Sequence, residues 1–80
     1  MKAKVEIFLK PGVLDVQGKA IEAALHGIGF PGASDVRVGR VITFDVTGAD
    51  KVAAEAEVRA MADKLLANQV IESYRVEIAA

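Results

Sequence analysis

Apolar and polar side chains alternate along residues 35–46, DVRVGRVITFDV. One parity of this segment carries its large apolar residues, Val36, Val38, Ile42, Phe44 and Val46. Successive side chains of an extended chain project to opposite faces, so these residues would share one face of a strand. We therefore predict one long strand over residues 35–46, bent at Gly39, around which the other elements fold.

A hairpin is the alternative interpretation of the same segment. Gly39-Arg40 suits a two-residue type II′ turn, and a ferredoxin-like βαββαβ fold would require a hairpin there. Such a turn would separate Ile42 from Val38, whereas a continuous strand keeps both on the buried face. The continuous strand is about twice the mean strand length, and Arg40 interrupts its apolar face midway. We expect its two halves to serve two different packing environments.

The amino-terminal residues 2–10 also alternate and predict a half-buried strand. The inward parity of this strand holds Ala3, Val5, Ile7 and Leu9. Phe8 falls on the outer parity, as does Val41 in the later strand, which indicates that a partner partly covers the outer face of the sheet. Proline and glycine end the strand in a turn at residues 10–12.

A first helix is predicted after Asp15, a favourable N-cap residue. Its apolar stripe consists of Leu14, Gly18, Ile21, Leu25 and Ile28. A glycine inside a helix costs about 1 kcal/mol relative to alanine, so we expect Gly18 to serve a close approach of the helix to the sheet. Gly27 and Gly29 are predicted to end the helix, with Phe30 folding back onto it.

A second helix is predicted after a break at residues 47–50, with Asp50 as its N-cap. Its apolar stripe consists of Ala54, Val58, Met61 and Leu65, widened by Ala62 and Leu66. Asn68 tolerates the left-handed conformation that commonly ends a helix. A short last strand is predicted next, because Tyr74, Val76 and Ile78 alternate with polar residues.

These elements predict an α+β domain of residues 1–80, in the order β-α-β-α-β, with both helices packed on one face of the sheet. A chain of 80 residues buries only about 60% of its unfolded surface, and small domains often need a disulfide, a metal or oligomerisation. Cysteine is absent, and there is one histidine, too few for a dedicated zinc site. We therefore predict that subunit pairing completes the fold, as a homodimer or a dimer of dimers.

The charge pattern narrows the range of partners. Ten basic and eleven acidic residues are interspersed and give a net charge of −1, without the basic surface and interleaved aromatic residues of a nucleic-acid-binding protein. The apolar runs are too short to cross a membrane, and the amino terminus lacks the apolar core of a signal peptide. We expect a cytoplasmic protein that binds neither nucleic acid nor membrane.

No catalytic, cofactor-binding or metal-binding group can be assembled from the spacing of residues. His26 stands without a cysteine or second histidine, so we assign it a structural or surface role. The turn at residues 10–12 lacks the GxxxxGK[ST] pattern of a phosphate loop. A binding or scaffolding module is therefore the first hypothesis, a ferredoxin-like module that binds a small regulatory ligand is the second, and an independent enzyme is the third.

Three segments together resemble one protein family. They are LKPGVLDVQGKAIEAALHGIGF, SDVRVGR and KLLANQVIESYRVEI, and their order and spacing are similar to those of the small subunit of phosphoribosylformylglycinamidine synthase, the PurS family. The resemblance runs from Val5 to Ile78 and identifies residues 1–80 as a single PurS-like domain. Val16 and Gln69 stand where the family often has proline. Val16 lies at a helix start, where proline is convenient but not required.

The resemblance implies a non-catalytic subunit of an ATP- and glutamine-dependent ligase in purine biosynthesis. A glutaminase subunit of that enzyme releases ammonia, and a synthetase subunit binds ATP, magnesium and formylglycinamide ribonucleotide. The small subunit, with no cofactor of its own, would bridge these partners and support ammonia transfer. Arg37 is the candidate partner contact, because it is long, charged and on the outer parity; a solvated surface arginine is the alternative.

Overall fold

The residues that the structure describes form three strands and two α-helices in the predicted β-α-β-α-β order, so the expected α+β class is confirmed. The elements are β1 (Lys2–Leu9), α1 (Val16–Gly27), β2 (Gly39–Asp45), α2 (Lys51–Met61), a π-helical turn η1 (Ala62–Leu66) and β3 (Glu72–Ala79). The structure, a computed structural model, describes residues 1–48 and 50–79. Ala49, within the predicted break at residues 47–50, lies outside the described residues.

The three strands form an antiparallel sheet in the order β2-β1-β3. The centre of the sheet is therefore β1, and the expectation that the chain is organised around residues 35–46 is wrong, because β2 is an edge strand. The predicted inward face of β1 is confirmed, since Ala3, Val5 and Ile7 are buried. Strands on both sides of β1, together with a helix over its inner face, shield these residues more completely than an edge strand is shielded.

The predicted absence of a hairpin at Gly39-Arg40 is confirmed. Both residues lie in β2 and pair with β1, Gly39 opposite Phe8 and Arg40 opposite Ile7. The predicted start of this strand at residue 35 is wrong, however, since β2 begins at Gly39. Asp35 adopts the left-handed conformation, with φ 52°, which breaks the extended run before it reaches the sheet.

The second helix packs on the sheet as predicted. Asp50 caps α2, its Oδ1 accepting a hydrogen bond from the Val52 amide at 3.0 Å. The predicted inward positions Ala54 and Val58 are buried. Leu65 was also expected inward, and that expectation is wrong, because its side chain is 82% exposed. The wider π-helical turn η1 rotates Leu65 out of the stripe, whereas Ala62 and Leu66, which were also expected inward, pack against the core.

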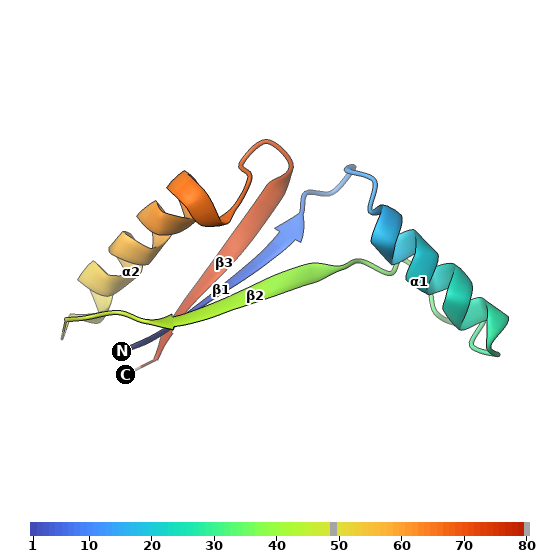
Figure 1. Cartoon of the computed structure of the whole chain (residues 1–80), viewed down its shortest axis with the longest axis horizontal. Coiled ribbons are helices and arrows are strands. Elements are labelled where there is room, and N and C mark those ends of the chain that lie inside the picture. The colour runs from blue at the N-terminus through green and yellow to red at the C-terminus, as the bar shows by residue number, and fades with distance from the viewer. Residues whose placement is uncertain (49, 80) are drawn as a thin grey trace.

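The first helix differs from its predicted placement. Asp15 is the N-cap of α1, as expected, but α1 does not pack on the sheet beside α2. Figure 1 shows α2 lying over the strands, whereas α1 lies beyond the end of β1, away from both termini. The expectation that both helices cover one face is therefore wrong for α1. Its buried residue is Gly18, and it packs against the segment before β2 instead of the sheet.

The displaced helix makes the molecule long and thin. Its dimensions are 49 × 26 × 14 Å, and its radius of gyration is 16.0 Å, whereas a compact chain of this length would have a radius of gyration of about 12 Å. The hydrophobic core lies between α2 and the inner face of the sheet. Helix α1 is consequently outside that core, and most of its apolar side chains are exposed.

Candidate interaction surfaces

A buried carboxylate joins α1 to the segment before β2. Asp15 Oδ1 accepts a hydrogen bond from the Gly18 amide at 2.7 Å, and Asp15 Oδ2 accepts one from the Val38 amide at 2.7 Å. These bonds, from Val38 first and Gly18 second, hold the pKa of the Asp15 carboxyl below its usual value. Asp15 is thus both the helix cap and a charged anchor for a residue far along the chain.

A second carboxylate on α1 holds the same segment. Glu22 Oε1 accepts a hydrogen bond from the Val36 amide at 3.1 Å. Asp15, Gly18 and Glu22 are spaced three and four residues apart, so they share one face of the helix. The amides of Val36 and Val38 are therefore bonded to helix side chains, and this explains why the predicted strand stops short of residue 35.

Arg37 lies between these two anchored amides. Its side chain is exposed, and its Nη2 donates a hydrogen bond to the Lys10 carbonyl oxygen at 3.3 Å. The guanidinium lies at a hollow of about 510 Å³ beside the turn at residues 10–12. The hollow is lined by Phe8, Leu9, Pro11, Gly12, Asp35 and Arg37. The structure thus places the one residue singled out as a partner contact at an open, mainly apolar depression.

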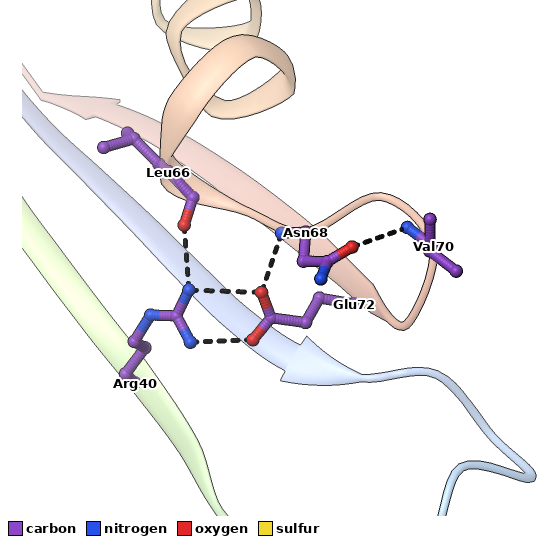
Figure 2. Close-up of polar contacts among 5 residues, drawn as sticks. All are labelled: Arg40, Leu66, Asn68, Val70 and Glu72. Carbon is purple, nitrogen blue, oxygen red and sulfur yellow. Dashed lines mark hydrogen bonds and ion pairs between the residues drawn. The ribbon is translucent and has the colours of Figure 1, made fainter.

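Figure 2 shows a second polar group, which connects β2 with the loop after α2. Arg40 pairs with Glu72 through two contacts, Nη1 to Oε2 at 2.7 Å and Nη2 to Oε1 at 3.1 Å. Arg40 Nη2 also donates to the Leu66 carbonyl oxygen at 2.9 Å, and Glu72 Oε1 accepts from the Asn68 amide at 2.7 Å. The hydrogen bond from Arg40 is the main cause of the lowered pKa of Glu72. This pairing accounts for an arginine on the inward parity of β2.

Glu22 and Glu72 are the two side chains of these polar groups that sequence reasoning did not single out. A signal for Glu22 was present, because it lies two helical turns from Asp15 and faces the same way. Arg40 itself was the signal for Glu72, since an arginine that interrupts the apolar face of a strand favours an acidic partner. His26 has the structural role expected of it, as its Nε2 lies 2.6 Å from the Ala33 carbonyl oxygen and ties the end of α1 to the following loop.

Exposed apolar side chains gather on α1 and the segments at its two ends. The large ones are Leu14, Val16, Ile21, Ile28 and Phe30, and the most exposed of these is Val16 at 71%. Leu14, Ile21 and Ile28 belong to the stripe that the sequence pattern predicted to face the sheet. Val16 and Phe30 lie within two residues of that stripe in the sequence. A helix face of this kind marks a protein interaction site when it is left uncovered.

The outer face of the sheet combines charge pairs with two exposed apolar residues. Glu6 contacts Lys4 at 3.4 Å and Arg75 at 3.7 Å, and Phe8 and Val41 lie on the same face, 38% and 56% exposed. The described residues contain no group of three or more histidine, cysteine or acidic side chains that could hold a metal. Within those residues, none of the helices has the length and apolar character needed to span a membrane.

Comparison with known proteins identifies a family and several relatives that this chain resembles. The model of the family described as PurS, phosphoribosylformylglycinamidine (FGAM) synthase, matches residues 2–80. The phosphoribosylformylglycinamidine synthase subunit PurS of Bacillus subtilis is 42% identical over 77 residues, which cover 96% of this chain and 90% of that protein. The match thus takes in every element of the fold.

Two solved structures extend the similarity to three dimensions. Methanocaldococcus jannaschii PurS, described as one of the subunits of formylglycinamide ribonucleotide amidotransferase in the purine biosynthetic pathway, is 37% identical, with a TM-score of 0.85 over 95% of this chain and 92% of that one. A chain in the structure of PurLQS from Thermotoga maritima is 28% identical, with a TM-score of 0.87 over 95% of this chain and 93% of that one.

Proposed function

This chain belongs to the PurS family of phosphoribosylformylglycinamidine synthase, and from that premise we propose that it is the small, non-catalytic subunit of that enzyme in de novo purine biosynthesis. The observation that carries the proposal is the similarity, over nearly the whole chain, to a chain of the Thermotoga maritima PurLQS structure. A place in a metabolic complex agrees with a small fold whose largest apolar surfaces are exposed, and nucleotide biosynthesis supports a cytoplasmic location.

The proposed role of the chain is to bind partner subunits through its surfaces. We assign to the synthetase subunit the binding of ATP, magnesium and the ribonucleotide, and to the glutaminase subunit the release of ammonia. The role of this chain is to bring the two together so that ammonia passes between them. Arg37 is our candidate for a contact with one of these partners, because it is exposed beside an apolar hollow.

The exposed stripe of α1 supports a homodimer as the form in which the chain enters the complex. Leu14 and Ile28 are 68% and 70% exposed, and burying such side chains contributes about 1.5–3 kcal/mol each. A second copy offers the same stripe, so two stripes can pack against each other about a two-fold axis. Two such dimers could then combine through the outer faces of their sheets, where Phe8 and Val41 are exposed.

Reconstitution of the enzyme tests the proposed function. The glutaminase and synthetase subunits are mixed with formylglycinamide ribonucleotide, ATP, magnesium and glutamine, and product formation is followed with and without this chain. Glutamine-dependent turnover should require the chain, because the glutaminase and synthetase sites must be assembled. Turnover of the synthetase with free ammonia should not require it, since no ammonia then has to be transferred.

A control separates assembly from a regulatory role. If the chain changes neither reaction and binds neither subunit, the proposal is overturned. A thermal-shift screen of the isolated chain with amino acids and nucleotides then tests the ferredoxin-like regulatory module, which requires a small ligand that raises the unfolding temperature.

A further inference from the structure

We propose that Asp15 and Glu22 are positioning residues that aim Arg37 at an aspartate or glutamate side chain of a partner subunit. This inference rests on the proposed function, because it assigns chemistry to one contact within the same assembly. It goes beyond a partner contact at Arg37 alone, since it names the residues of α1 that hold the arginine and the chemical group that the arginine recognises.

The geometry begins with the two amides on either side of Arg37 in the chain. The amides of Val36 and Val38 both donate to carboxylates of α1. Two such bonds fix the rotation of the segment about its own axis. Val36 and Val38 are consequently half-buried, and Arg37 is exposed.

Gly18 lets α1 approach closely enough for these bonds to form. It lies between Asp15 and Glu22 on the same helix face, and a β-carbon at this position would overlap the carbonyl oxygen of Val36. Asp15, Gly18 and Glu22 therefore form one surface of α1, here called the seat, which holds residues 36–38. Because the seat lies on a helix, the direction of Arg37 does not depend on a flexible loop alone.

The surroundings of Arg37 favour a carboxylate of a partner protein. A guanidinium has five N–H donors. Within the described residues, Arg37 makes one hydrogen bond, to the Lys10 carbonyl oxygen, and no ion pair. The hollow beside it has apolar walls from Phe8, Leu9 and Pro11, which would lower the local dielectric around a docked group.

A second charge in the hollow distinguishes between possible anions. Asp35 lines the same hollow, so its negative charge offsets much of the attraction of Arg37 for an anion, and the cost of desolvating the anion, which is greater for a double charge, then decides between ligands. A singly charged carboxylate held in the fork of Arg37 by two hydrogen bonds fits this site better than a doubly charged phosphate. The apolar walls would accept the methylene groups of an aspartate or glutamate side chain.

The test is a double-mutant cycle measured by titration calorimetry of the chain against the glutaminase and synthetase subunits. Arg37→Ala should weaken binding to one of them about 10- to 100-fold, which corresponds to loss of a charged hydrogen bond. Glu22→Ala should weaken the same interaction less, because Asp15 still holds Val38. In the Arg37→Ala background, Glu22→Ala should have no further effect, since it acts only through the arginine.

Matched variants keep the result interpretable. Glu22→Gln keeps an oxygen that accepts from the Val36 amide, so it should bind as the natural chain does. Arg59→Ala removes an exposed arginine from α2 and should leave the affinity for that subunit unchanged. Arg37→Lys keeps the positive charge but loses the fork of two hydrogen-bond donors. Its affinity should therefore lie between those of the natural chain and Arg37→Ala.

The outcomes separate this inference from the proposed function. Failure of the natural chain to bind either subunit overturns the proposed function and the inference with it. Normal binding by Arg37→Ala, or equal losses for Arg37→Ala and Arg59→Ala, overturns the inference alone. Additive losses from Arg37→Ala and Glu22→Ala would show that Glu22 does not act through Arg37, and the positioning role would be discarded.

Discussion

Gly18 is the glycine with the least room for an added β-carbon. Replacing a helical glycine by alanine normally stabilises a helix by about 1 kcal/mol. At Gly18 the new methyl group would meet the Val36 carbonyl oxygen, and overpacking of this kind costs about 1–3 kcal/mol. We therefore predict that Gly18→Ala lowers the free energy of unfolding, measured by urea denaturation at fixed protein concentration.

Gly27 provides the matched control on the same helix. It is the last residue of α1, and nothing lies near the position that its β-carbon would take. Gly27→Ala should therefore be neutral or stabilising under the same conditions. Equal stability of the two variants would contradict the close packing of α1 on Val36.

Asp15 and Gly18 show what can be predicted from neighbouring residues in the sequence and what cannot. Asp15 was identified from the sequence because an N-cap is a local signal, readable from the residues that follow it. Its second hydrogen bond, to the amide of Val38, joins residues 23 positions apart and has no local signal. Gly18 was correctly expected to allow a close approach, but the sequence could not say that the partner would be the segment at Val36 instead of the sheet.

At the scale of elements, the pairing of Arg40 with Glu72 joins the first residues of β2 to the start of β3 across β1. The pKa of Glu72 is lowered in the folded chain, chiefly by Arg40. A lowered pKa means that the carboxylate contributes stability above its unfolded pKa of about 4.3, and that this contribution is lost as the pH falls through the folded pKa.

We therefore predict that Arg40→Ala destabilises the chain most at neutral pH. The expected loss is about 1 kcal/mol, because half of the arginine side chain is exposed to solvent. The difference from the natural chain should shrink as the pH falls below the unfolded pKa and Glu72 becomes protonated at its lowered folded pKa. Urea denaturation at a series of pH values measures it. A difference that stays constant with pH would mean that the charge pair with Glu72 is not the cause.

Some elements were predicted correctly from the sequence and others were misplaced, and each outcome has a physical reason. Period-two alternation identified the buried face of β1, because burial of Val5 and Ile7 on one face fixes the register. The stripe of α2 was correct except at Leu65, which the π-helical turn η1 rotates out to solvent while Ala62 and Leu66 keep their predicted inward positions. The strand predicted over residues 35–46 was shortened because side chains of α1 bind its first amides.

At the scale of the whole molecule, an elongated shape is the main departure from expectation. The amphipathic pattern of α1 correctly predicted a helix with one apolar face, but a pattern does not say whether the covering surface belongs to the same chain. The described residues leave that face open, with Leu14 and Ile28 largely exposed. A stable form in solution therefore requires a second surface against α1, and the predicted homodimer supplies one.

We predict that the natural chain sediments as a dimer or a larger species and that Ile21→Lys shifts it toward monomer. Ile21 lies within the apolar stripe. A charge buried at a subunit interface without a partner destabilises the dimer, and each 1.4 kcal/mol of destabilisation raises the dissociation constant of the dimer about tenfold. Ala23→Lys adds the same charge on the opposite side of α1, because two residues along a helix turn the side chain by more than half a circle. Sedimentation equilibrium should therefore separate the two variants. If both dissociate equally, added charge alone weakens the assembly; if neither dissociates, the copies meet elsewhere, and the open face of α1 is left for a partner subunit.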